Sequence, residues 1–352
     1  MSGGAGLGSR LHDYDYELPT ALIAQHPPQE RGDSRLMHLP AEGPPHHQQF
    51  RDLPSLLSPG DLLVLNDTRV IPARIRFEHR GSDAEILLLE AAGAGEDTWW
   101  CLLRPGKKAP PGTRIQVRFG LWADVLTQEP GGRRRVRFSP PGRLAQLLPE
   151  IGEMPLPPYI TEPLDEPERY QTVFAGEPGS AAAPTAGLHF TAELLEQLAS
   201  QGVGHAKVTL RIGLDTFQPL RVEDLDDHRM HSEWYRISAP ARSEIEACRA
   251  RGGRVVAVGT TVARTLEAAA ARRTAGDGTP DEGRTAIFIR PGFQFREVDL
   301  LLTNFHLPRS TLLVMVSAFS GRERILDAYR EAVRSGYRFF SFGDAMLLEP
   351  AS

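Results

Sequence analysis

The hydrophobic pattern gives residues 61 to about 150 a texture that differs from the rest of the chain. Short apolar runs alternate there with turn sequences such as Arg104-Pro105-Gly106. Many short strands at this spacing are typical of a small antiparallel barrel or sandwich. The predicted strands are Asp61–Leu65, Val70–Glu78, Glu85–Glu90, Trp99–Arg104, Arg114–Phe119, Trp122–Thr127 and Arg133–Phe138.

The remainder alternates strands with helices. Apolar and polar residues alternate over His205–Ile212, the period-two pattern of a half-buried strand. The apolar run Arg254–Val258 predicts another strand, followed by a helix over Val262–Arg272. The sequence therefore predicts an α/β main domain, residues 1–60 plus 151–352, with a small antiparallel β-barrel domain, residues 61–150, inserted into it.

Cap signals predict three more helices. Thr191 precedes a helical stretch that runs to about Ser200, and Ser310 precedes one that runs through Phe319. A further helix is predicted over Arg322–Arg334, because Gly336 follows it.

Charge and composition narrow the class of protein. The 352 residues carry a net charge of −5, so a nucleic-acid partner requires a local basic patch. No apolar run approaches the roughly 20 residues of a membrane span. The two cysteines, Cys101 and Cys248, lie far apart and are typical of reduced thiols in a cytoplasmic protein. Between residues 98 and 143 ten basic residues face two acids, a local charge of +8: Arg104, Lys107, Lys108, Arg114, Arg118, Arg133, Arg134, Arg135, Arg137 and Arg143.

Two segments place glycine and polar groups ahead of a helix. Pro184–Thr191 contains Thr185, Gly187 and His189, and the histidine serves either as a base or as a hydrogen-bonded structural residue. Gly259-Thr260-Thr261 follows a strand and precedes the helix that carries Arg264. Its amides and hydroxyls either bind a carboxylate or phosphate, or only cap the helix.

Two further segments carry histidine. His231 and Glu233 fall on one face of a strand-like stretch that His228 precedes. Since no companion cluster supplies other ligands, paired recognition or acid–base work is favoured over a metal site. Pro308 disfavours helix at the residue before it, so Asn304 and His306 are predicted on an extended turn before a capped helix. Dinucleotide, P-loop and metalloprotease motifs are absent from the sequence.

In order, these motifs resemble the S-adenosylmethionine:tRNA ribosyltransferase-isomerase family of queuosine biosynthesis, over nearly the whole chain. The resemblance also covers the following motifs: Asp13–Pro19, Ile23–Gln25, Arg31–Leu36, Leu65–Arg74, Pro157–Ile160 and Tyr337–Met346. It implies an α/β main domain with an inserted β-barrel. The implied reaction transfers the ribosyl part of S-adenosylmethionine to 7-aminomethyl-7-deazaguanine at the wobble position of tRNA with a G-U-N anticodon, giving epoxyqueuosine, adenine and methionine.

The resemblance implies no metal and no cofactor, because S-adenosylmethionine is consumed as a co-substrate. The chain is expected to act as a monomer or homodimer. We expect catalytic roles for His189 and His306 as proton shuttles and for Glu233 as an acceptor. Substrate-binding roles are expected for Thr185, Gly187, His231, Gly259, Thr260, Thr261, Arg264, Asn304, Arg31 and Asp344. The expected tRNA contacts are Arg133, Arg134, Arg135, Lys107 and Lys108.

Anticodon bases are read best when they stack on aromatic rings. Phe190, Trp234, Tyr235 and Phe305 are the candidate stacking residues.

Three positions depart from the family pattern: Arg211, Asp215 and Val262. The departures at Arg211 and Asp215 keep open a catalytically silent RNA-binding homologue. The main alternative is a different S-adenosylmethionine-dependent tRNA enzyme such as a methyltransferase, although the sequence lacks a Gly-rich Rossmann loop.

Overall fold

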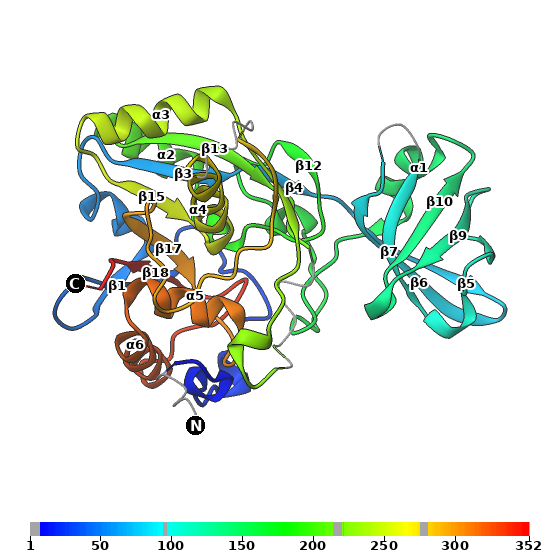
Figure 1. Cartoon of the computed structure of the whole chain (residues 1–352), viewed down its shortest axis with the longest axis horizontal. Coiled ribbons are helices and arrows are strands. Elements are labelled where there is room, and N and C mark those ends of the chain that lie inside the picture. The colour runs from blue at the N-terminus through cyan, green and yellow to red at the C-terminus, as the bar shows by residue number, and fades with distance from the viewer. Residues whose placement is uncertain (1–7, 94–96, 214–219, 221, 275–280, 352) are drawn as a thin grey trace.

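The computed structural model describes residues 8–93, 97–213, 220, 222–274 and 281–351, which form a larger and a smaller unit joined by extended segments (Figure 1). The α-helices are α1 (Arg143–Ile151), α2 (Ala192–Ser200), α3 (Ala239–Ala250), α4 (Thr260–Thr274), α5 (Thr311–Ser320) and α6 (Arg322–Arg334). The strands of the smaller unit are β5 (Arg74–His79), β6 (Ser82–Ala91), β7 (Thr98–Arg104), β8 (Arg114–Gln116), β9 (Trp122–Gln128), β10 (Arg134–Ser139) and β11 (Gly152–Glu153).

The larger unit is built on a nine-stranded mixed sheet with the order β16-β14-β13-β3-β15-β17-β18-β1-β2. Its centre, β13-β3-β15-β17, is parallel, and antiparallel strands flank it. The strands are β1 (Arg35–Leu39), β2 (His46–Gln49), β3 (Leu62–Asn66), β13 (Gly204–Leu210), β14 (Glu233–Ile237), β15 (Val255–Val258), β16 (Glu282–Thr285), β17 (Leu300–Asn304) and β18 (Ala345–Leu348). A separate parallel pair consists of β4 (Thr68–Val70) and β12 (Glu177–Ser180).

Helices cover both faces of this sheet, which explains its continuous apolar strands. On one face, Leu62, Ala257 and Leu301 pack with residues of α3, α4, α5 and α6. On the other, Leu63 and Val256 pack with α2 and a short 3₁₀ helix. Because the parallel strands are buried on both sides, the loops at their carboxyl ends are the natural location for a binding site.

The cap predictions are confirmed. Thr191 Oγ1 accepts a hydrogen bond from the amide of Leu194 at the start of α2, and Ser310 Oγ accepts one from Leu313 at the start of α5. Helix α6 has the predicted bounds, and α4 begins two residues earlier than predicted. In these ranges no helix has the length and apolar character that a membrane crossing requires.

The predicted start of the inserted unit is wrong in one respect. The strand predicted over Asp61–Leu65 pairs in parallel with β13 and β15, so it belongs to the centre of the nine-stranded sheet. The strand predicted over Val70–Glu78 is interrupted at Pro72, since proline cannot donate to a sheet ladder. The smaller sheet therefore spans residues 74–153.

The smaller unit is a curled antiparallel sheet, in the order β11-β5-β6-β7-β10-β9-β8. The prediction of antiparallel strands is confirmed, but the predicted barrel is not closed, because β8 and β11 remain at opposite edges of the order. Helix α1 contributes Leu144, Leu148 and Ile151 to the core that the curled sheet encloses. This packing removes apolar surface from water without full closure of the sheet.

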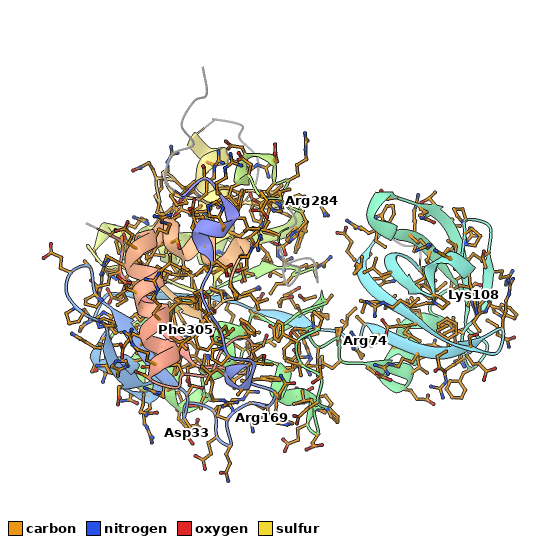
Figure 2. All side chains as sticks on the ribbon, turned by 90° about the horizontal axis from the view of Figure 1, so that it is seen from below. Asp33, Arg74, Lys108, Arg169, Arg284 and Phe305 are labelled. Atoms are coloured by element: carbon orange, nitrogen blue, oxygen red, sulfur yellow. The ribbon has the colours of Figure 1, made fainter. Side chains whose placement is uncertain are left out.

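Ionic contacts also link the two units. Glu90 of the smaller unit pairs with Arg133 beside it, at 2.7 Å, and with Arg284 of the larger unit, at 2.9 Å. Figure 2 shows Arg284 on the side of the larger unit that faces the smaller one, and Arg74 where the chain passes between them. Exposed ion pairs contribute about 0–1 kcal/mol each, so these contacts orient the units more than they stabilise them.

Candidate functional site

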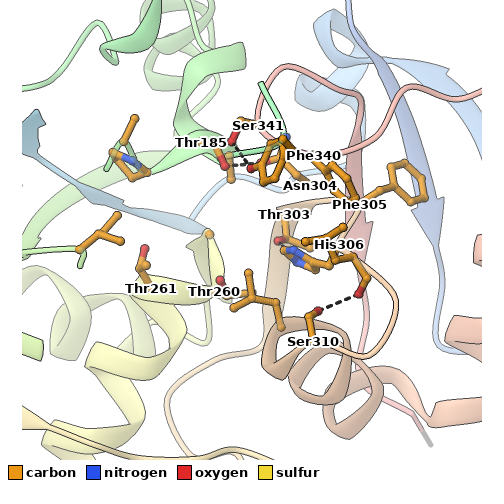
Figure 3. Close-up of a pocket in the computed structure, with 18 residues that line it drawn as sticks. Thr185, Thr260, Thr261, Thr303, Asn304, Phe305, His306, Ser310, Phe340 and Ser341 are labelled. Carbon is orange, nitrogen blue, oxygen red and sulfur yellow. Dashed lines mark hydrogen bonds between the residues drawn. The ribbon is translucent and has the colours of Figure 1, made fainter. Parts of the chain in front are cut away.

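A pocket lies at the carboxyl ends of the parallel strands β15 and β17 (Figure 3). The sheet brings together six of the predicted site residues, from segments far apart in sequence: Thr185, Gly259, Thr260, Thr261, Asn304 and His306.

The start of α4 forms one wall. Gly259 has φ +96, a backbone conformation that favours glycine, and its amide donates to the carbonyl of Leu302 at 2.7 Å. The chain thereby turns from β15 directly into α4. The first amides of a helix have no partner within the helix, so Thr260 and Thr261 bring both amides and hydroxyls to the pocket wall.

Asn304 forms the opposite wall, and Figure 3 shows it bonded to Thr185. Its Oδ1 accepts from Thr185 Oγ1 at 3.0 Å, and its Nδ2 lies 3.1 Å from His189 Nε2. The other imidazole nitrogen, Nδ1, lies 3.0 Å from Ser34 Oγ. An amide has two donor hydrogens and two acceptor lone pairs, so Asn304 keeps one of each for a ligand.

His189 lies behind Asn304 and outside the pocket lining. Its burial, together with the charges of Arg31 and Arg338, lowers its pKa to about 3. The imidazole is therefore neutral, and both of its nitrogens have partners. Because its two nitrogens contact Asn304 and Ser34, we expect His189 to position the Asn304 amide, and its role as a proton shuttle stays a prediction.

His306 lines the pocket itself. Its Nε2 lies 2.9 Å from Thr303 Oγ1, and burial lowers its pKa to about 3. The hydroxyl of Tyr16 donates to the His306 carbonyl at 2.6 Å, and the His306 amide donates to Tyr329 Oη at 3.0 Å. The turn after β17 is thus fixed from both sides, with a neutral imidazole facing the pocket.

These two low pKa values give a pH prediction. A buried neutral histidine binds fewer protons than the unfolded chain between its folded pKa of about 3 and its ordinary value of 6.5, so its stabilising contribution is complete above pH 6.5 and is lost on acidification. Each group changes the free energy of unfolding by up to about 1.4 kcal/mol per pH unit in this window.

His189→Gln and His306→Gln should each show a slope between pH 4 and 6 that is shallower than wild type by about that amount. Urea unfolding at several pH values measures it, and the difference from wild type cancels the other titrating groups. Parallel curves for the variants and wild type would contradict the assignment of buried neutral imidazoles.

Glu233, Arg264 and His231 form a cluster that does not line the pocket. Arg264 Nη1 donates to Glu233 Oε2, whereas Oε1 of the same carboxylate lies 3.2 Å from His231 Nε2 and accepts from the Gly213 amide at 3.3 Å. Burial alone would raise the pKa of Glu233, but the charge of Arg264 and the His231 contact hold it at about 2. Glu233 is therefore the ion-pair partner of Arg264, which lies one helical turn beyond the pocket-lining Thr260, and its catalytic role stays a prediction.

Arg264 is 2% exposed, and its Nε and Nη2 have no hydrogen-bond partner among the described residues. Its predicted role in binding a carboxylate or phosphate is not supported by the pocket lining, which excludes it.

Three other predicted binding residues shape the backbone. Arg31 donates to the carbonyls of Leu188 and Glu168, at 3.1 and 3.0 Å, beside His189. Asp344 accepts from the amides of Arg35 and Arg338, both at 2.8 Å, and burial raises its pKa. A Cβ at Gly187 would come within 2.7 Å of the Phe174 ring, so glycine is required there for packing.

Sequence reasoning missed one wall of the pocket. Tyr159 and Phe340 lie ring to ring with their centroids 4.8 Å apart, and Tyr159 Oη lies 2.7 Å from Ser341 Oγ. Phe340 has φ +72, a strained value for a bulky residue that is common at functional sites. The motifs Pro157–Ile160 and Tyr337–Met346 contained these residues, but only the fold brings the two motifs to one pocket.

Most of the predicted base-stacking residues are core. Phe190 is fully buried and Tyr235 is 1% exposed, whereas Phe305 is fully buried but also lines the pocket. Trp234 is half-buried, with the Arg211 guanidinium 4.6 Å from its ring.

The three positions that depart from the family pattern lie in different environments. Arg211 is exposed over Trp234, Val262 lies in the first turn of α4 and is buried in the core, and Asp215 lies outside the described residues.

The predicted tRNA contacts fall into two groups, arginines that are buried or paired within the protein and lysines that are exposed. Arg134 is buried and donates to the carbonyls of Ala109, Gly132 and Gly106, so it holds turns and cannot meet a phosphate. Arg133 is tied to Glu90, and Arg135 is half-buried. Lys107 and Lys108 are exposed, and Figure 2 shows Lys108 on the smaller unit. The described residues contain no group of three potential ligands that would hold a metal ion.

The mixed sheet with its strand-end pocket and an inserted curled sheet defines a two-unit α/β protein with a small-molecule site lined by uncharged side chains. Among families, the model of the queuosine biosynthesis protein matches residues 11–348, and the chain belongs to this family.

Curated relatives and a solved structure agree with this assignment. The chain is 55% identical to the S-adenosylmethionine:tRNA ribosyltransferase-isomerase of Symbiobacterium thermophilum, covering 96% of this chain and 99% of that one. Identity to the protein of the same name from Moorella thermoacetica is 53%, with the same coverage. The crystal structure of S-adenosylmethionine tRNA ribosyltransferase from Thermotoga maritima is 40% identical, with a TM-score of 0.54 over 95% of this chain and 99% of that one.

Proposed function

We propose that this chain is an S-adenosylmethionine:tRNA ribosyltransferase-isomerase. It transfers the ribosyl group to 7-aminomethyl-7-deazaguanine at the wobble position of tRNA with a G-U-N anticodon and releases adenine and methionine. The family assignment supports the reaction class. The single observation that supports this pocket as the reaction site is its uncharged lining: among the described residues, the lining contains no acid, lysine or arginine.

A neutral pocket suits a sulfonium substrate. The positive sulfur meets no competing cation, since His306 is kept neutral by burial. The paired rings of Tyr159 and Phe340 offer π faces, which attract cations within about 6 Å of a ring centroid. The amides and hydroxyls of Thr260 and Thr261 suit the methionine carboxylate at the helix start.

The chemistry requires a proton acceptor and polar donors. The sulfonium acidifies the adjacent C5′ hydrogens of the ribose, and their loss gives an ylide-like carbanion. Ring opening expels adenine, the primary amine of the deazaguanine adds, and methionine leaves as the epoxide closes. We assign the role of proton acceptor to His306, because its imidazole is neutral before the reaction and, unlike that of His189, lines the pocket. Asn304 also lines the pocket and is assigned hydrogen bonding to the ligand. No cofactor or metal enters this scheme.

Turnover with a stem–loop RNA that carries the aminomethyl base tests the function. With S-adenosylmethionine present, the expected products are adenine and methionine in equal amounts, together with epoxyqueuosine in the RNA. Formation of S-adenosylhomocysteine would instead identify a methyltransferase. RNA binding without either product would identify a catalytically silent homologue.

The exposed lysines of the smaller unit give a prediction for RNA affinity. Lys107→Glu with Lys108→Glu should weaken tRNA binding and lower the slope of log affinity against log salt by about 0.7–0.9 for each phosphate that the variant no longer neutralises. Arg134→Gln should instead lower the melting temperature, since Arg134 donates to three carbonyls inside the unit. An unchanged salt slope in the lysine variant would place these lysines outside the interface.

A further inference from the structure

The hairpin between β8 and β9 carries an exposed aromatic ring at its tip. The side chain of Phe119 is 54% exposed. The Leu121 amide donates to the Arg118 carbonyl at 2.8 Å, and the two central residues, Phe119 and Gly120, have φ values of +47 and +74. Two positive φ values in a two-residue hairpin loop define a type I′ turn.

Folding does not explain a phenylalanine at this position. Type I′ turns favour asparagine, aspartate or glycine, and an L residue in the left-handed region costs about 1–2 kcal/mol. Burial of the ring would offset that cost, but more than half of Phe119 faces solvent. The ring is therefore available for a contact outside the chain.

The outer face of the same hairpin is basic. Ile115 and Val117 point into the core, so Arg114 and Arg118 point outward on alternate positions. Arg137 follows on the adjacent strand, and the Arg114 and Arg137 side chains are 60% and 54% exposed. We call this surface the hairpin face; it consists of Arg114, Arg118, Phe119, Trp122, Asp124, Arg137 and Arg143. Asp124 is its one acid, so four arginines leave a net charge of +3.

Arginines and aromatic rings alternate across the hairpin face. The Arg118 guanidinium lies 5.3 Å from the centroid of Phe119, and that of Arg114 lies 5.0 Å from the centroid of Trp122. Arg143 donates to the Phe119 carbonyl at 3.2 Å and so brings a further cation to the turn. Aromatic rings that accept stacked bases, set among cations that meet phosphates, are the features by which proteins bind unpaired RNA.

We propose that the hairpin face binds the substrate tRNA outside its anticodon loop, with Phe119 stacked on an unpaired base and the arginines against the backbone. The proposal rests on the proposed function, which supplies the tRNA. The face belongs to the seven-stranded sheet, whereas the pocket lies at the strand ends of the nine-stranded sheet. The two surfaces therefore lie on different units of the chain.

Phe119→Asn provides the sharpest test, because asparagine tolerates the left-handed conformation and removes only the ring. We expect the melting temperature to stay the same or rise. Fluorescence anisotropy should show full-length tRNA bound about tenfold more weakly than by wild type. Binding of the isolated anticodon stem–loop should not change.

Arg330→Gln on α6, where the side chain is 56% exposed, is the matched control for removal of a surface arginine and should bind tRNA like wild type.

Charge removal gives a second arm. Arg118→Gln with Arg137→Gln should lower the salt slope for full-length tRNA by about 0.7–0.9 for each phosphate that is no longer neutralised, and leave the slope for the stem–loop unchanged. Wild-type affinity of both variants for full-length tRNA would overturn the proposal, as would an equal decrease in affinity for both RNAs. Because binding is measured without turnover, a failure of the proposed reaction would appear separately, as wild-type protein that binds tRNA but releases no adenine.

Discussion

Arg264→Met is expected to lower the free energy of unfolding by about 3–5 kcal/mol. Arg264 and Glu233 are 2% and 3% exposed, and the substitution leaves the Glu233 carboxylate buried without its cation. The contacts from His231 and the Gly213 amide remain, so they reduce the destabilisation but do not cancel it. Urea unfolding measures this change in free energy. The helical circular dichroism signal reports on the larger unit, because most of the helices cover its nine-stranded sheet.

A double variant separates the effect of the ion pair from that of packing. Arg264→Met with Glu233→Met removes both charges and should recover most of the stability, because an apolar pair of similar volume often replaces a buried ion pair without cost. The cost of the single variant should also shrink on acidification. In wild type the contribution of Glu233 to the free energy of unfolding is complete above its ordinary pKa of 4.5 and is lost as the pH falls toward about 2. In the variant the unpaired carboxyl takes up its proton at higher pH, so the difference between the two proteins becomes smaller. A double variant no more stable than the single one would show that packing of the arginine, and not its charge, is what matters.

Asn304→Ala is expected to lower kcat/KM for the tRNA substrate by about 100-fold, the usual effect of removing one oriented hydrogen-bond donor from a reaction site. Thr185 and His189 fix the amide from two sides and leave one N–H and one lone pair for the ligand. Release of adenine at limiting substrate measures the change. An unchanged melting temperature would establish that the fold is retained, and activity within a fewfold of wild type would exclude Asn304 from the reaction.

The role of His189 is tested through Asn304. His189→Gln should lower activity in the wild-type background but have little further effect when Asn304 is already alanine, because a positioning residue acts only through the group that it orients. Ser34→Ala is the matched control, since Ser34 bonds the imidazole nitrogen that faces away from Asn304. An undiminished effect of His189→Gln in the Asn304→Ala background would return His189 to an independent catalytic role.

Local signals explain which elements were predictable. The hydroxyls of Thr191 and Ser310 bond amides three residues later, so the information that begins α2 and α5 lies within one turn of sequence. The strand at Leu62–Asn66 was assigned to the wrong sheet, because an apolar run has the same pattern in any buried strand and its partners, β13 and β15, lie more than 130 residues away. Closure of the smaller sheet was mispredicted for the same reason, since pairing between its two edges is a long-range property.

By itself, the sequence determined the α/β and antiparallel β units, the starts of α2, α5 and α6, and the motifs that identify the family. It also named six residues of the pocket. The tertiary structure alone decided the burial and the partners of the predicted site residues: it placed Asn304 between Thr185 and His189, paired Glu233 with Arg264, and buried Arg134 among carbonyls. The physical reason is that residue type and local pattern specify which groups are available, whereas burial and partner geometry, which fix protonation and access, arise only when distant segments pack together.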